Sequence, residues 1–262
     1  MRILKLRSEM DLNSANYRVN NDVIDSLPGS ALFMSEEINL DSYDIVLLSQ
    51  YSRWKDYGNL LKRVKEHKVK TVLFDNDSCY RSFSDKFYEG INYIFYRCAD
   101  EDGRTPENGS WLPWSVDTKY FTPSYGGEGI IMPCTVNRQY PLRRRIHRIL
   151  PRKREVGLNY VASLQNAAGA IHTDSPIVPQ VRAKALEYAA CGTHIISNRT
   201  SQMDFFFPDE LITYFDEVAE VKEMIENFEP NVEVQKELRH IVETKHSTEH
   251  RVKEIMEILH DV

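Results

Sequence analysis

The chain of 262 residues carries a formal net charge of −6, with 42% hydrophobic and 27% charged residues. This composition is typical of a globular protein, and the excess of acidic groups argues against a protein that coats nucleic acid without sequence preference. None of the four cysteines lies within four residues of another, which excludes a CxxC zinc or redox pair and favours free thiols. No apolar run approaches the roughly 20 residues of a membrane span, and the first residues do not form a signal peptide. We therefore expect a cytoplasmic protein without a transmembrane segment.

Short apolar runs alternate with a helical pattern in the first half of the chain. The runs that predict strands are 3–6, 44–51, 70–75 and 91–98. Between residues 54 and 67 apolar side chains recur every three or four positions, which predicts a helix. Strands that alternate with helices are typical of right-handed βαβ units and a mostly parallel sheet, so the expected fold class is α/β. The polar segment 100–110 is rich in turn-forming residues and predicts a loop.

A glycine-rich stretch at 124–129 is the most linker-like part of the chain and marks the expected domain boundary. We place an N-terminal domain at 1–123 and a C-terminal domain at 124–262. The strands predicted in the second half are 129–136, 156–160, 169–173, 194–198 and 211–215. The helices predicted there are 141–154, 181–192, 218–228 and 247–262, and the segment 201–210 is expected to begin as a short helix. The last helix is amphipathic, and we expect its apolar stripe to pack back on the N-terminal domain.

Four local patterns of the second half occur in the same order as in a known enzyme superfamily. They are WLPWSVDTKYFTP at 111–123, NRQYPLRRRI at 137–146, KALEYAACGTHIIS at 184–197 and KHSTEHRVKEIMEIL at 245–259. They resemble the hinge, the YP-x-R segment, the Glu-containing helix of the donor site and the terminal helix of the glycosyltransferase-B (GT-B) superfamily. The resemblance is greatest to the spore-maturation-type (CgeB-like) and group 1 glycosyltransferases.

This resemblance implies two Rossmann-like domains that face each other across a cleft. It also implies an enzyme that moves a sugar from a nucleotide-sugar donor to an acceptor hydroxyl. Enzymes of this architecture usually work without a bound metal, so the implied co-substrate is a sugar linked to UDP or GDP, with no further cofactor. The C-terminal domain would bind the donor and the N-terminal domain the acceptor.

The carboxylate of Glu187 is the first candidate for a donor contact. A carboxylate accepts two hydrogen bonds at once, which suits the paired hydroxyls of a ribose, and the resemblance gives Glu187 this role. Arg182 and Lys184 precede it on the same predicted helix and are further candidates for donor binding. The alternative interpretation is a surface glutamate that pairs with Lys184 or Arg182.

Polar residues that follow the predicted strand 194–198 are candidates for phosphate binding. Asn198, Thr200 and Ser201 would form a loop and the N-terminus of the next helix, where backbone N–H groups attract anions. In a doubly wound sheet ligands bind at the carboxyl ends of strands, which is where this loop is expected. The alternative is an ordinary capped turn.

The segment 143–154 holds seven arginine or lysine residues in twelve positions. In one hypothesis Arg143 or Arg144 neutralises the diphosphate of the donor, whose negative charge grows as the glycosidic bond breaks. In a second hypothesis the cluster binds a polyanionic acceptor such as DNA or an anionic membrane surface. A solvated basic helix face is the third interpretation.

Three residues are candidates for direct catalysis. Asp75 and Asp77 follow the predicted strand 70–75, and either carboxylate could deprotonate an acceptor hydroxyl, although both also suit a helix cap. His172 ends the predicted strand 169–173 and could contact the donor sugar, or it could be a hydrogen-bonded structural residue. We expect no metal site, because two carboxylates alone are weak evidence for one.

Several functional alternatives stay open. The position eight residues before Glu187, where many retaining relatives carry an acid, is Pro179 here, and the nearest upstream acid is Asp174. This leaves the stereochemistry open and allows a non-catalytic nucleotide-sugar-binding or scaffold protein. The basic segment allows a phage-type glycosyltransferase that acts on modified bases of DNA. The sugar, the acceptor (glycan, protein, lipid or modified DNA) and the oligomeric state are not determined by the sequence.

Overall fold

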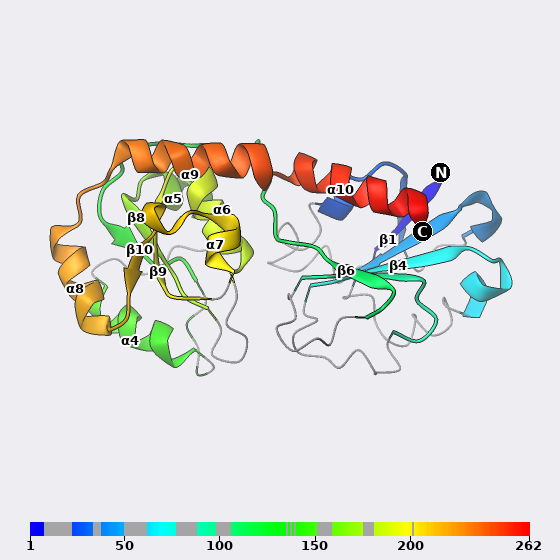
Figure 1. Ribbon diagram of the computed structural model, residues 1–262, viewed down its shortest axis with the longest axis horizontal. Coiled ribbons are helices and arrows are strands. Elements are labelled where there is room, and N and C mark those ends of the chain that lie inside the picture. The colour runs from blue at the N-terminus through cyan, green and yellow to red at the C-terminus, as the bar shows by residue number, and fades with distance from the viewer. Residues whose placement is uncertain are drawn as a thin grey trace. The chain divides into compact units, whose positions relative to one another are not determined.

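The chain forms two compact units in the computed structural model, which describes residues 1–7, 23–33, 38–49, 62–76, 88–97, 106–134, 136, 138, 140–150, 159–174, 181–200 and 202–262. The first unit comprises Met1–Pro113 with Arg251–Val262, and the second comprises Trp114–His250 (Figure 1). The second unit therefore begins at Trp114, earlier than the boundary expected at residue 124. The segment from 114 to 123 bonds to the second unit, for example where the Val116 N–H donates to the His246 carbonyl.

The sheet of the first unit has the strand order β2-β1-β3-β4-β5-β6, and every neighbouring pair is parallel. Its strands are β1 (Ile3–Arg7), β2 (Ser30–Phe33), β3 (Ile45–Ser49), β4 (Lys70–Asp75), β5 (Tyr93–Tyr96) and β6 (Gly109–Trp111). The four apolar runs predicted as strands are confirmed, while β2 and β6 were not predicted. The edge strand β6 lies partly in the segment expected to be a loop. Glycine is required there, because a Cβ on Gly109 would come within 2.6 Å of the Ile94 carbonyl oxygen.

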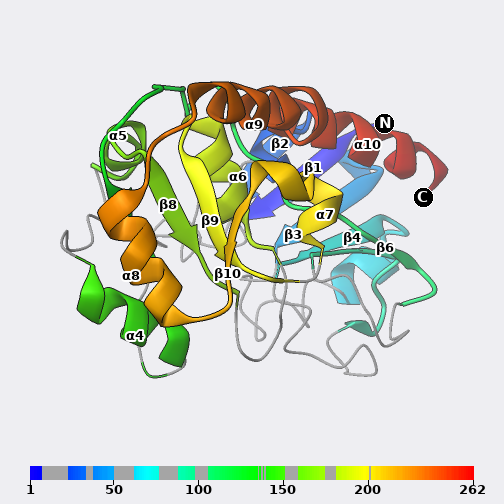
Figure 2. The same ribbon diagram turned by 60° about the vertical axis from the view of Figure 1, so that its left-hand side comes forward.

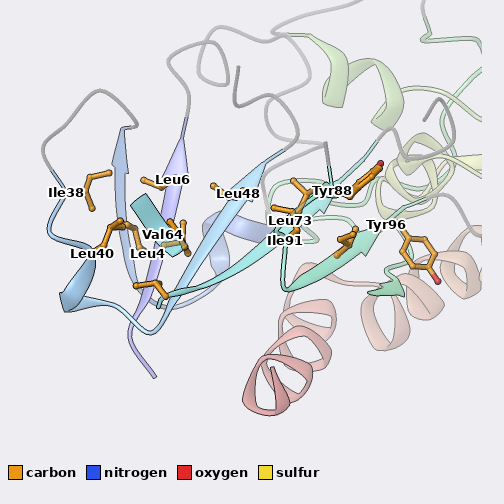
Figure 3. Close-up of a cluster of buried hydrophobic side chains, with 13 residues drawn as sticks. Leu4, Leu6, Ile38, Leu40, Leu48, Val64, Leu73, Tyr88, Ile91 and Tyr96 are labelled. Carbon is orange, nitrogen blue, oxygen red and sulfur yellow. The ribbon is translucent and has the colours of Figure 1, made fainter. Parts of the chain in front are cut away.

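Apolar side chains cover both faces of this sheet, which is why its strands read as continuous hydrophobic runs. One face carries the cluster shown in Figure 3, to which β1, β3, β4 and β5 contribute together with Val64 of the helical segment 62–66. The other face packs against residues 23–27 and against α10 (Thr248–Asp261), which contributes Ile255 and Leu259. The terminal helix thus belongs to the core of the first unit.

The sheet of the second unit has the parallel order β10-β9-β8-β7. Its strands are β7 (Ile130–Ile131), β8 (Gly169–His172), β9 (His194–Asn198) and β10 (Thr213–Phe215). The longer helices of this unit are α4 (Pro141–Ile149), α6 (Ala183–Ala190), α8 (Val218–Asn227) and α9 (Val232–Lys245). Helices α4 and α8 share one apolar cluster with the sheet, and α6 and α9 lie on its other side (Figure 2). None of the helices described is both long and apolar enough to cross a bilayer.

Three segments of the second unit differ from the prediction. Tyr160, the last residue of the strand expected at 156–160, instead begins the short helix α5 (Tyr160–Gln165). The segment 201–210 begins with the expected short helix, α7 (Met203–Phe206), but the strand expected at 211–215 starts only at Thr213, because the 3-10 turn η4 (Asp209–Leu211) precedes it. Helix α9 was not predicted. Its start is marked by Asn231, whose side chain accepts hydrogen bonds from the N–H groups of residues 233 and 234.

Arg239 of α9 ties three parts of the second unit together. Its guanidinium donates to the carbonyl oxygens of Phe121 and Ala190, each at 2.6 Å, and of Thr118 at 3.0 Å. Its Nε also donates to Glu243 at 2.7 Å. The segment that enters the unit, the end of α6 and the middle of α9 are therefore held by one buried side chain.

Replacing Arg239 with methionine is expected to lower the free energy of unfolding by roughly 2–4 kcal/mol, because carbonyl oxygens that now accept from the guanidinium lose their donor. Urea unfolding followed by circular dichroism measures this loss. Lys236→Met on the same helix is the matched control, since Lys236 forms an exposed ion pair with Glu233 and should cost nothing measurable. Equal stability of the two variants would contradict a role for Arg239 as a clamp.

Candidate active site

The carboxyl ends of β8 and β9 bring polar side chains together at one edge of the second sheet. Asp174 follows β8 and Asn198 ends β9, and the Asn198 Nδ2 donates to Asp174 Oδ1 at 3.1 Å. Burial raises the pKa of Asp174, an effect that the hydrogen bond from Asn198 and the charge of Arg143 partly offset. Ligands of doubly wound sheets bind at such an edge, which makes it the candidate site.

Helix α4 contributes Arg143 to this edge. The Nε of Arg143 donates to Thr173 Oγ1 at 2.6 Å, and its Nη2 donates to the Thr173 carbonyl oxygen at 2.7 Å. The guanidinium also lies over the ring of Tyr140, with Cζ 4.0 Å from the ring centroid. Arg144, the other arginine proposed for the diphosphate, is exposed. The structure therefore separates the two candidates and leaves Arg143 beside the end of β8.

Positive charge gathers around His172, the last residue of β8. Burial, together with the charges of Arg143, Arg182 and Lys184, lowers the pKa of His172 to about 3. These cations come from α4 and from the start of α6. Three cations therefore act on the end of β8, where their charge would favour a bound anion.

The hydrogen bonds of His172 define which ring nitrogen carries the proton. Ser197 Oγ donates its single proton to the Asn198 carbonyl oxygen at 2.8 Å, so it accepts from His172 Nδ1 at 3.1 Å. Nε2 is then a bare acceptor, and it is buried without a hydrogen-bond partner in the described part of the chain. At neutral pH His172 has no proton to give from Nε2, so it suits a contact with a hydroxyl group better than general-acid catalysis.

Glu187 is buried on α6 and is only 2% exposed. Its Oε2 accepts a hydrogen bond from the hydroxyl of Tyr160, and Lys184 Nζ lies 3.4 Å from the same hydroxyl. The interpretation of Glu187 as a surface residue paired with Lys184 or Arg182 does not fit this burial. Tyr160 was missed at the sequence level, because it ends an apolar run that suggested a strand.

The remaining sequence candidates are Asp75, Thr200, Asp77 and Ser201. Asp75 belongs to the first unit, where it ends β4, is fully buried and accepts a hydrogen bond from the hydroxyl of Tyr88. Thr200 lies in the second unit, two residues after β9. Asp77 and Ser201 lie outside the described residues. Within the described residues no group of three or more His, Cys, Asp or Glu side chains is arranged to hold a metal ion.

Comparison with solved structures identifies the fold. HepE of Anabaena in complex with UDP matches with a TM-score of 0.66 and 9% sequence identity, and the match covers 100% of both chains. Sucrose-phosphate synthase of Thermosynechococcus elongatus matches with a TM-score of 0.64 and 10% identity, over 100% of this chain and 98% of that one. A DNA-modifying β-glucosyltransferase matches with a TM-score of 0.65 and 10% identity, over 96% of each chain. The expected fold of two Rossmann-like domains, the glycosyltransferase-B type, is thereby confirmed.

The family comparison agrees with this class. A family model described as glycosyl transferase-like matches residues 142–257. The resemblance to the glycosyltransferase-B superfamily is confirmed at the level of the fold, while the narrower resemblance to the spore-maturation type stays a prediction. A comparison with curated proteins finds no match.

The low pKa of His172 makes stability depend on pH. The unfolded chain binds a proton at this histidine near its ordinary pKa of 6.5, whereas the folded protein does so only at about 3. The contribution of His172 to stability is therefore fully present above its ordinary pKa of 6.5 and is lost as the pH falls toward the folded value of about 3. Between about pH 7 and about pH 5 this histidine should account for a loss on the order of 2 kcal/mol.

Urea unfolding of His172→Asn and the parent protein at these two pH values tests this dependence. The asparagine keeps an N–H donor for Ser197 but does not titrate, so the variant should lose less stability on acidification. His240→Asn, on the exposed side of α9, controls for the removal of a histidine. An unchanged pH dependence in His172→Asn would show that His172 is not held neutral by burial.

Proposed function

We propose that this protein transfers a sugar from a nucleotide-sugar donor to an acceptor hydroxyl, and that the second unit binds the donor. The observation that carries this proposal is the gathering of Arg143, Arg182 and Lys184 around the end of β8. Lys184 also contacts Tyr160, the hydrogen-bond partner of the buried Glu187. A diphosphate and a ribose are the two parts of a nucleotide sugar that need such cations and such a carboxylate.

Each part of the site has a role in this reaction. Arg143 presents the planar fork that binds phosphate oxygens in pairs, and its charge stabilises the diphosphate as the glycosidic bond breaks. The backbone around Asn198 and Thr200, after β9, supplies further donors for the diphosphate. Glu187 accepts hydrogen bonds from the ribose hydroxyls. His172 Nε2 accepts a hydrogen bond from a hydroxyl of the sugar, and Asp174 lies at the same edge.

The nucleotide is proposed to be UDP, with GDP as the second choice. HepE, which shares the fold, has been solved in complex with UDP and with UDP-glucose. The first unit is proposed to bind the acceptor, with the buried Asp75 as the group that deprotonates its hydroxyl. Because neither of the two described cysteines, Cys134 and Cys191, forms a disulfide, we propose a reducing cytoplasmic location.

Modified DNA is the second candidate acceptor. Arg144, Arg145 and Arg148 are exposed on the same helix, α4, away from the contacts of Arg143. A DNA-modifying β-glucosyltransferase is among the proteins that share the fold. Duplex binding that weakens steeply with salt would favour this acceptor, and no binding at low salt would exclude it.

Isothermal titration calorimetry of Arg143→Met and Arg145→Met with UDP and GDP tests the donor site. The Arg143→Met variant should bind the preferred diphosphate about 10-fold to 100-fold more weakly, because a charge-assisted hydrogen bond is lost. Arg145 lies on the exposed face of the same helix, so Arg145→Met should bind like the parent protein. Unchanged affinity in Arg143→Met, with the fold intact by circular dichroism, would contradict the proposed diphosphate site.

A further inference from the structure

Tyr160 occupies a position between two side chains of the proposed donor site. Its hydroxyl donates to Glu187 Oε2, and Lys184 Nζ lies 3.4 Å from the hydroxyl oxygen. An ammonium group can only donate hydrogen bonds, so the Tyr160 oxygen accepts from Lys184 and gives its single proton to Glu187. The direction of both hydrogen bonds is therefore fixed by the chemistry of the groups.

The hydroxyl of Tyr160 keeps this proton throughout the physiological range. Burial raises the pKa of Tyr160 well above its ordinary value, and the charge of Glu187 raises it further. Tyr160 is thus a permanent donor to the carboxylate. The contact does not depend on pH in the range where the enzyme is expected to work.

The ring of Tyr160 is itself held in place. Lys184 Nζ lies 4.7 Å from the centroid of the ring, and Phe121 meets the ring edge to face with centroids 6.3 Å apart. Helix α5 fixes the backbone of Tyr160. A rigid ring presents its hydroxyl at a fixed point, so it can fix whatever that hydroxyl binds.

A glutamate carboxylate needs such a partner if it is to recognise a ribose. The terminal torsion of glutamate is broad, so the plane of a carboxylate is not set by the side chain alone. A carboxylate offers about four lone-pair sites, and one hydrogen bond from Tyr160 leaves enough of them for two ribose hydroxyls. The hydroxyl of Tyr160 therefore orients the carboxylate without blocking it.

We propose that Tyr160 is a positioning residue for ribose recognition, which holds the carboxylate of Glu187 in the plane that accepts both ribose hydroxyls. This inference rests on the proposed function, because it assigns the hydroxyls of a nucleotide to Glu187. It adds a residue outside the sequence motifs, from a different helix.

The test compares UDP with 2′,3′-dideoxy-UDP in calorimetric titrations of the full chain. The parent protein should prefer UDP by about 10-fold or more, because the dideoxy compound leaves the buried carboxylate without its hydroxyl partners. Tyr160→Phe should reduce this preference about 3-fold to 10-fold, because it weakens the binding of UDP. Its affinity for dideoxy-UDP should stay within about 2-fold of that of the parent protein. Tyr125→Phe removes the hydroxyl of a tyrosine that is 38% exposed and should leave the preference unchanged.

Two further variants separate positioning from other effects. In Glu187→Ala the preference should be lost, and adding Tyr160→Phe should change it no further, because Tyr160 acts through Glu187. Lys184→Met should weaken both ligands alike and keep the preference, since it removes a charge but leaves the Tyr160 hydroxyl in place. A loss of preference in Lys184→Met would overturn the assignment of the orienting contact to Tyr160.

The outcomes distinguish this inference from the function on which it rests. If Tyr160→Phe leaves the preference for UDP unchanged, including the case in which both ligands bind equally more weakly, the positioning role is overturned. The ribose contact of Glu187 then still stands. A parent protein that binds UDP and dideoxy-UDP equally well overturns the ribose contact itself. If the parent protein binds neither UDP nor GDP, the proposed function fails and the inference fails with it.

Discussion

The burial of the Glu187 carboxylate is the constraint on which the second unit depends. A charged group removed from water costs several kcal/mol unless hydrogen bonds replace those of the solvent. Tyr160 provides one of them, so helices α5 and α6 are held in a fixed relation. Helix α6 can approach the sheet closely because its inward positions are mostly alanine, and Gly192, with a φ of +73°, turns the chain from α6 into β9. The carboxylate is thereby held close to the end of the sheet that carries the cations.

The cations at this edge suit the anion that the proposed function assigns to them. Arg143, Arg182 and Lys184 lower the pKa of His172, and the half-buried Asp174 lies at the same edge. Stability alone does not explain such a gathering, because cations near one another repel and a buried histidine nitrogen without a partner costs free energy. A diphosphate removes the first of these costs, and a sugar hydroxyl removes the second. In the proposed function, a nucleotide sugar offsets these costs of the free protein.

The sequence predicts the elements that depend on local pattern and misses those that depend on contacts across the chain. Buried parallel strands appear as apolar runs, and so β1, β3, β4 and β5 were found, whereas β6 needs Gly109 to approach its neighbour and carries no apolar run. The location of Glu187 on the helix just before Gly192 followed from its motif. Its partner Tyr160 did not, because it lies far away in the sequence and no motif contains it. The sequence likewise could not distinguish Arg143 from Arg144, because only the structure shows which face of α4 lies toward the end of β8.

The crystal structure of the full chain with UDP tests the central claim most directly, namely that the second unit binds the ribose through Glu187 and the diphosphate through the cations at the end of β8. The account predicts both ribose hydroxyls within hydrogen-bond distance of the Glu187 carboxylate, with the hydroxyl of Tyr160 still donating to it, and phosphate oxygens on the guanidinium of Arg143. A nucleotide whose ribose lies away from Glu187, or whose phosphates contact none of these cations, would contradict it.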